Sequence, residues 1–249
     1  MKTIAILLVA LAIYMIYKSV PVFYKTKART LYSKGEYHKS KAIFEKLVKS
    51  SSNDVSLVME YTYLLLKMGE YEDAERVINT ILCKNLSPQT RSKAVILRCM
   101  CYDRNNNFDE AYSDACELYE SGYRSMDLYS LLGYFKLKKN PASKETYDFC
   151  AEAYDYADDN RDICDNMLMC YYYAKDYDKA KELSDEIIEN NPRFVEGYYH
   201  SAQLYVAMGE SDLARSLIGE ISNCDRSGLT TVSQSEIDEL SDSLQEVNE

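Results

Sequence analysis

Eight cysteines are the residues of this chain whose type most readily supports chemistry. Thiolates bind zinc, and a cysteine beside a histidine can act as a nucleophile. Cys99 and Cys101 lie two residues apart, which is not the Cys-x-x-Cys spacing of a metal site, and side chains two apart on a helix point in different directions. We therefore expect no metal, and free thiols that pack as small apolar groups, a pattern suited to a reducing compartment. The eight are Cys83, Cys99, Cys101, Cys116, Cys150, Cys164, Cys170 and Cys224.

The other candidate catalytic groups do not form a recognisable set. His38 falls in a polar turn, and His200 lies far from it on an apolar helix that could place it in a groove or on the surface. The neighbouring carboxylates Asp158 and Asp159 fall in an expected loop, where solvated charge explains them. The sequence contains no glycine-rich phosphate loop and no Ser-His-Asp spacing. These patterns predict a protein that is not an enzyme and needs no cofactor.

The elements that carry these residues recur at a fixed interval. The turn Gly35-Glu36-Tyr37 returns 34 residues later as Gly69-Glu70-Tyr71, and a small residue follows each turn, Ser40 in one and Ala74 in the other. Glycine permits the tight turn between two helices, and the small residue lets the second helix approach the first. A period of 34 residues is typical of stacked helix-turn-helix units.

These units resemble the tetratricopeptide repeat family. The pattern of a turn, an aromatic residue and a small residue recurs further along the chain, with Asn106 in place of one glycine. We count six units over residues 21–228, of which the one around Asn140-Pro141 is the weakest and marks a break in the array. The spacing from Ala74 to Ala111 is 37 rather than 34, which predicts a three-residue insertion near residues 85–88. The later matches are Phe108 with Ala111, Tyr177 with Ala180, and Gly209 with Ala214.

The expected fold is therefore an all-α, right-handed α-solenoid of about six repeats, preceded by one transmembrane helix. We divide the chain into an anchor over residues 1–23, a repeat array over 24–228, and a capping helix with a tail over 229–249. Ser233 and Glu236 form a capping box at the start of that last helix. Its apolar residues are expected to cover the open end of the array, as solenoids require. They are Ile237, Leu240, Leu244 and Val247.

The amino-terminal segment is apolar and uncharged from Thr3 to Tyr17. As a helix these residues reach about 22 Å, and continuation through Phe23 meets the roughly 30 Å hydrocarbon core if Lys18 extends to the interface. Pro21 then marks a kink or the exit from the bilayer. The alternatives are a signal peptide cleaved near Ala10-Leu11-Ala12, which leaves a short apolar region, and a buried helix.

Basic residues follow this segment, whereas only Lys2 precedes it. The positive-inside tendency therefore places the repeats in the cytoplasm at the cell membrane, where the basic residues would also meet anionic lipids. An exported domain remains the alternative, because Lys2 before an apolar run also begins exported chains. The membrane-flanking residues are Lys18, Lys25, Lys27 and Arg29.

The charge composition of the chain bears on which classes of partner it can bind. The formal net charge is −11, with 18 Lys and Arg against 14 Asp and Glu in residues 1–125, and 11 against 26 in residues 126–249. Phosphate binding needs clustered basic groups, so we expect no nucleic acid as a partner. The 24 tyrosines, with no tryptophan, suit half-buried helix faces whose hydroxyls reach water.

The resemblance implies that the first helices of the units line a concave groove that binds a protein or peptide. In chaperone-binding members of the family a clamp of basic residues and Asn recognises an acidic tail; Lys25 and Lys93 fit it, but Arg29, Glu60 and Leu97 do not. We therefore expect an apolar helix or extended peptide as the ligand. The predicted function is a membrane-tethered scaffold, with an exported envelope protein or a regulatory subunit of a membrane-associated enzyme as alternatives. The groove residues are Tyr32, Met59, Tyr63, Ile96, Met100, Tyr134, Met169, Tyr172, Tyr173 and Tyr199, beside Lys25, Arg29 and Lys93.

Overall fold

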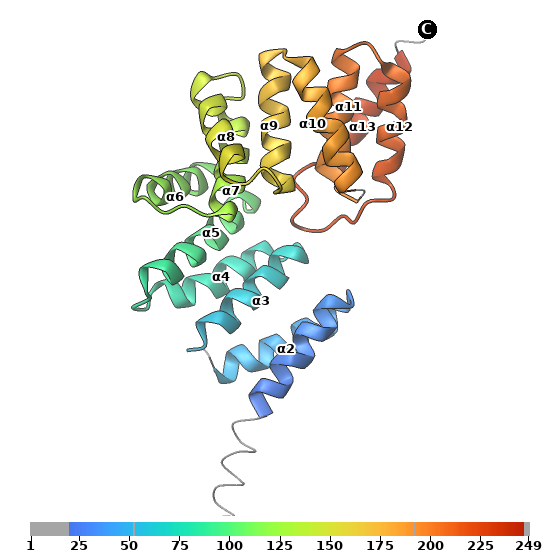
Figure 1. Ribbon diagram of the computed structural model, residues 1–249. Coiled ribbons are helices and arrows are strands. Elements are labelled where there is room, and N and C mark those ends of the chain that lie inside the picture. The colour runs from blue at the N-terminus through green and yellow to red at the C-terminus, as the bar shows by residue number, and fades with distance from the viewer. Residues whose placement is uncertain (1–19, 52, 192, 247–249) are drawn as a thin grey trace, which may run out of the picture. The chain divides into compact units, whose positions relative to one another are not determined.

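The computed structural model describes residues 20–51, 53–191 and 193–246, and the regular secondary structure of these residues is helical (Figure 1). A helix over residues 20–33 is followed by the labelled helices α2 to α13. Their bounds are α2 Tyr37–Ser50, α3 Val55–Lys67, α4 Tyr71–Leu82, α5 Pro88–Arg104, α6 Phe108–Glu120, α7 Met126–Lys139, α8 Lys144–Tyr156, α9 Arg161–Ala174, α10 Tyr177–Asn190, α11 Val195–Ala207, α12 Ser211–Ile221 and α13 Gln234–Glu246.

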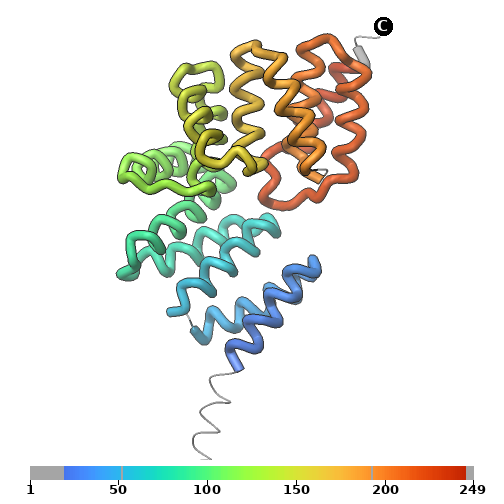
Figure 2. Tube along the Cα trace, viewed as in Figure 1, coloured from blue at the N-terminus to red at the C-terminus, as the bar shows by residue number. Residues whose placement is uncertain are grey.

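These helices form the six predicted pairs and one final helix. The first helices of the pairs are residues 20–33, α3, α5, α7, α9 and α11; within each of the two compact units described next, we call the surface that these helices present its first-helix face. The chain divides into two compact units, Met1–Asn107 and Phe108–Glu249, whose helices can be followed in Figure 2. The boundary falls in the turn of the third pair, where Asn106 has a φ of +64°.

The break expected at Asn140-Pro141 is therefore misplaced, because that turn is well formed. Ser143 accepts a hydrogen bond from the Thr146 amide at 3.1 Å and caps α8. The Thr146 hydroxyl in turn donates to the Asn140 carbonyl at 2.9 Å. α7 ends without a left-handed residue at its cap, Asn140, and Ser143 caps the start of α8, so the fourth pair forms without the family's turn sequence.

The turns of the other five pairs share one geometry. Gly35 and Gly69 adopt φ values of +75° and +79°, which side chains disfavour. The residue after each glycine donates its amide to a carbonyl five residues earlier, as Glu36 does to Leu31 at 2.9 Å. This is the hydrogen bond that ends a helix in a Schellman motif. Lys175 adopts the same conformation, with a φ of +60°, in the fifth pair.

The small residues after the turns are fully buried, as predicted. Ala74, Ala111, Ala180 and Ala214 have no exposed surface. Ser40 occupies the same position in the first pair, where its hydroxyl donates to the carbonyl of the equally buried Ala28 at 2.8 Å. The hydrogen bond satisfies the one polar atom that the close approach of the helices buries.

The predicted insertion lies at the junction between the end of α4 and the start of α5. Residues 83–87 connect the two helices, and Ser87 caps α5 by accepting from the Thr90 amide at 3.3 Å. Pro88 occupies the first turn, where its missing amide hydrogen costs nothing. The extra residues lengthen α5 to 17 residues.

The last helix, α13, covers the end of the sixth pair. The predicted capping box is present, since the Ser233 amide donates to Glu236 at 2.7 Å and the Glu236 amide donates to the Ser233 hydroxyl at 3.2 Å. Ile237 and Leu244 are buried in one cluster with residues of α11 and α12, and Leu240 packs against it. Val247 lies outside the described residues.

The predicted anchor, residues 1–23, falls largely on residues 1–19, which lie outside the described part of the chain. From residue 20 the helix continues unbroken to residue 33, so the boundary drawn after Phe23 does not end a helix. Val22 and Phe23 are each 64% exposed. In the described ranges, no helix combines the length and the apolar character needed to span a bilayer.

Candidate partner-binding faces

The cysteines serve as packing residues. All eight are thiols rather than disulfides in the described structure, and five of them are buried. Burial raises the pKa of Cys101 and of Cys164 to about 12, so both thiols stay protonated at neutral pH. Within the described residues no group of three His, Cys, Asp or Glu side chains could hold a metal ion.

The two histidines have different surroundings. His38 is exposed in the first turn of α2. His200 on α11 lies with its Nδ1 2.8 Å from a carboxylate oxygen of Asp165 on α9, and both side chains are largely buried. Burial lowers the pKa of His200, but the charge and hydrogen bond of Asp165 outweigh it, so the pKa rises above its ordinary value. The loop over residues 157–160 carries Asp158 and Asp159, both exposed, as expected.

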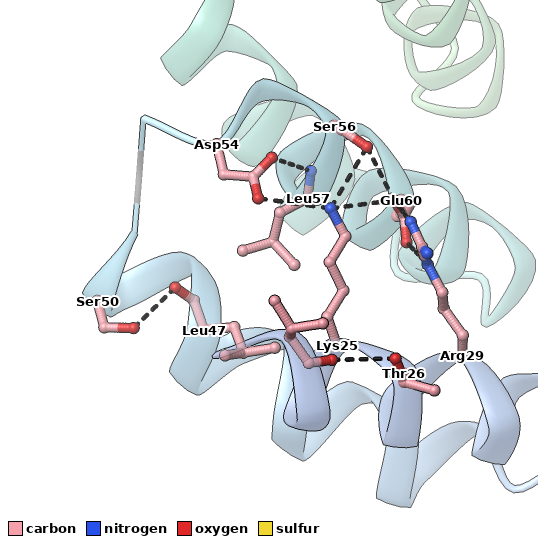
Figure 3. Close-up of polar contacts among 10 residues, drawn as sticks. Lys25, Thr26, Arg29, Leu47, Ser50, Asp54, Ser56, Leu57 and Glu60 are labelled. Atoms are coloured by element: carbon pink, nitrogen blue, oxygen red, sulfur yellow. Dashed lines mark hydrogen bonds and ion pairs between the residues drawn. The ribbon is translucent and has the colours of Figure 1, made fainter. Parts of the chain in front are cut away.

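In the first unit, basic and acidic residues tie the first helix to α3 (Figure 3). Arg29 makes two hydrogen bonds to the Glu60 carboxylate, at 2.7 and 2.6 Å. Lys25 Nζ lies 3.4 Å from Asp54 and 3.5 Å from Glu60. Burial raises the pKa of Glu60, but the hydrogen bond from Arg29 and the charges of Lys25 and Arg29 lower it by more. The pKa therefore lies below its ordinary value, and the carboxylate is held ionised.

This network gives two predicted site residues a different role. Lys25 and Arg29 were assigned both to the groove and to the membrane flank, yet here their charges are directed at carboxylates of α3. Their observed role is to join consecutive first helices. Lys27 is exposed, and Lys18 lies outside the described residues.

A tyrosine-lysine cluster also lies on the first unit, made of Tyr32, Tyr37, Tyr63 and Lys67. The rings of Tyr32 and Tyr37 are 5.5 Å apart. Lys67 Nζ lies 5.5 Å from the Tyr32 ring centre and 5.3 Å from that of Tyr37, within the range of cation-π attraction. Tyr63 is 40% exposed. The predicted residue Tyr32 thus contacts two residues, Tyr37 and Lys67, that the repeat pattern does not predict for the site.

The other predicted residues of the first unit differ in burial. Met59 and Met100 are half-buried, and Lys93 is exposed. Ile96 is only 5% exposed, so its assignment to the groove surface is wrong. On a helix, apolar residues that face the core recur at the same spacing as apolar residues that face the groove. Spacing alone does not separate the two, which explains the error.

In the second unit, tyrosines gather at the carboxyl end of α9. The Tyr172 ring lies 5.1 Å from that of Tyr173 and 6.4 Å from that of Tyr177. Tyr173 is 40% exposed, and Tyr172 is half-buried. Tyr134, on α7, is also half-buried and lies 5.6 Å from the ring of Phe135.

Two predicted residues of this unit are buried. Met169 is 7% exposed and belongs to the core, so its assignment to the groove surface is wrong. Tyr199 on α11 is 8% exposed; its hydroxyl accepts a hydrogen bond from the Gln203 amide at 3.1 Å, and its ring lies 5.5 Å from His200. Tyr199 therefore packs beneath the surface residues and is not itself part of the exposed surface. The sequence did not indicate the Asp165–His200 pair, because the partners lie 35 residues apart and only the stacking of α9 on α11 joins them.

Two segments of the sequence match the family described as tetratricopeptide repeat, over residues 23–54 and residues 169–193. Comparison with curated proteins gives no match. Among solved structures, a tetratricopeptide repeat protein from Parabacteroides merdae is similar with a TM-score of 0.69 and 12% identity, over 90% of this chain and 84% of that one.

Two further structures share the fold but hold different partners. The Cut9-Hcn1 hetero-tetramer of APC/C matches with a TM-score of 0.71 and 12% identity, over 89% of this chain and 42% of that one. The human IFIT1 dimer with m7Gppp-AAAA matches with a TM-score of 0.65 and 12% identity, over 84% of this chain and 51% of that one. Two segments of the chain therefore match the tetratricopeptide repeat, and the structural similarities show that the chain has the fold of tetratricopeptide-repeat proteins.

Proposed function

We propose that this protein is a non-catalytic scaffold that binds a protein or peptide on its first-helix faces and is held at the membrane by its amino-terminal segment. The observation that carries the proposal is the exposure of tyrosines on first helices in both units, at Tyr63 and Tyr173. Tyrosine supplies a large contact area at a small entropic cost, and residues of this kind dominate the energy of protein interfaces.

Charge favours a protein partner over a nucleic acid. Residues 108–249 carry 12 Lys and Arg against 31 Asp and Glu, which repels phosphate. Residues 1–107 carry 17 against nine, but several of these cations are paired within the unit: Lys25 with Asp54, Arg29 with Glu60, and Lys41 with Glu70. The first unit therefore offers less free positive charge than its composition suggests.

The membrane part of the proposal rests on the sequence. An apolar run from Thr3 to Tyr17 followed by Lys18 and Lys27 fits a single-pass anchor whose repeats face the cytoplasm. Protease treatment of intact cells tests the orientation, since digestion of the repeats from outside would contradict it.

The binding test compares one double alanine variant with the wild-type chain and with a control alanine variant. Partners are crosslinked in membranes and recovered with the wild-type chain, with Tyr63→Ala combined with Tyr172→Ala, and with Tyr156→Ala. Tyr156 is 51% exposed but lies on the second helix α8. We expect the paired variant to lose its partners and the control to keep them, with both remaining helical by circular dichroism. Equal recovery by the paired variant and the wild type would refute the proposal.

A further inference from the structure

The second unit gathers negative charge from three helices, one of which, α9, also carries the exposed Tyr173. Asp162 and Asp165 come from α9, Glu196 from α11, and Glu236 and Glu239 from α13. The loop before α13 is fixed to α11, because Glu196 accepts hydrogen bonds from the amide and the hydroxyl of Thr231, at 2.6 and 3.0 Å. This contact holds the acidic start of α13 near α11.

The negative charges of these carboxylates change the pKa of nearby ring side chains. Burial raises the pKa of Tyr199, and the charges of Glu236 and Glu239 raise it further, to about 12. His200 is subject to Asp165, Glu196 and Glu236 together. Its Nδ1 lies 2.8 Å from Asp165, and the carboxylates of Glu196 and Glu236 also act on it. Arg161 lies 3.5 Å from Asp162 and offsets part of this charge, but the five carboxylates outnumber the basic groups beside them, so the surface keeps an excess of negative charge.

The aromatic groups at the carboxyl end of α9 also suit a cationic ligand. Tyr173, 40% exposed, and Tyr172 can receive a lysine or arginine over their rings. Ammonium and guanidinium groups are donors that carry the complementary charge.

We propose that the first-helix face of the second unit, around Tyr172, Tyr173 and the acidic residues Asp162 and Glu239, binds a peptide segment rich in lysine or arginine. The inference rests on the proposed scaffold function and names its partner class. An acidic tail is disfavoured at this face by like-charge repulsion, and an uncharged apolar helix would leave the carboxylates without compensation.

The test selects peptides from a random display library on the full-length chain, purified in mild detergent. The charge variant is Asp162→Asn combined with Glu239→Gln, which spares the capping box. Its control is Glu182→Gln combined with Glu189→Gln, which removes the same charge from exposed positions on the second helix α10. The aromatic variant is Tyr173→Ala, with Tyr156→Ala as its control.

We expect the selected peptides to be enriched in lysine and arginine. Their affinity should fall about tenfold in the charge variant, since each exposed pair contributes modestly, and should remain within about twofold in its control. It should also fall in Tyr173→Ala, and about 1 M salt should weaken it strongly because the screening length is then about 3 Å.

The results that would contradict the cationic-peptide site differ from those that would contradict the scaffold function. Selection of neutral or acidic peptides that require Tyr63 and Tyr172 would overturn the cationic preference and leave the scaffold function standing. Cationic peptides that respond equally to the two charge variants would show attraction to the whole unit and overturn the site. Peptides that none of the tyrosine variants weakens would overturn both proposals.

Discussion

The close approach of α7 and α9 gives a prediction in which two opposing effects can be compared. Gly133 lies on α7, and a Cβ atom added there would sit 2.6 Å from Nδ2 of Asn166 on α9. That nitrogen donates to the Ser130 carbonyl at 2.9 Å, and Asn166 is only 7% exposed. Gly133→Ala must therefore displace a buried side chain that is already hydrogen-bonded.

The two effects have opposite signs. Alanine is favoured over glycine inside a helix by about 1 kcal/mol. Overpacking costs about 1–3 kcal/mol, and loss of the Asn166 hydrogen bond adds about 1 kcal/mol. The steric cost outweighs the helical gain, so we expect Gly133→Ala to destabilise the second unit by about 1–3 kcal/mol.

The assay is urea denaturation followed by far-ultraviolet circular dichroism. With a slope of about 2 kcal/mol per molar urea, the midpoint should fall by about 0.5–1.5 M. Gly219→Ala in α12 is the matched control, because a Cβ there meets nothing within 4 Å; its midpoint should rise or stay the same. A midpoint for Gly133→Ala at or above that of the wild type would refute the steric reasoning.

Three further predictions follow from particular contacts. Ser233→Ala should cost about 1 kcal/mol and increase hydrogen exchange in α13, because it removes the capping box; unchanged exchange would contradict that role. The pKa of His200 is raised by Asp165, so the stability from this pair is complete below the unfolded pKa of about 6.5 and declines as the pH rises through the folded value; His200→Asn should remove this dependence in denaturation curves recorded across pH. A thiol reagent should modify exposed Cys83 quickly and the buried cysteines only after unfolding, and rapid modification of them in the folded state would contradict their packing role. The buried cysteines are Cys99, Cys101, Cys150, Cys164 and Cys170.

The repeat pattern predicts the fold well because it depends on local rules. The turn at Gly35, the small residue at Ala74, the insertion before Pro88 and the capping box at Ser233 each reflect a constraint within a few residues of the chain. The break was misplaced because the turn at Asn140 forms without a left-handed residue, with Ser143 capping the start of α8. The actual unit boundary lies beside Asn106, which keeps the left-handed conformation of the other turns.

The site is predicted less well because it depends on neighbours that are distant in sequence. The family pattern marks which helix faces a groove but does not separate Ile96 or Met169, which are buried, from Tyr63, which is exposed. The pairing of Arg29 with Glu60 requires knowledge of how consecutive first helices stack. The acidic surface of the second unit arises from three helices, and composition alone indicates its charge but not its place.

The most direct test of the scaffold account is site-specific photo-crosslinking in intact membranes. A photoreactive residue is placed at position 63, 173 or 156, which samples the first-helix face of each unit and the second helix α8. The account predicts that one or more defined partners are captured from positions 63 or 173 and not from position 156. Capture from position 156 alone, or equal capture from all three positions, would contradict it.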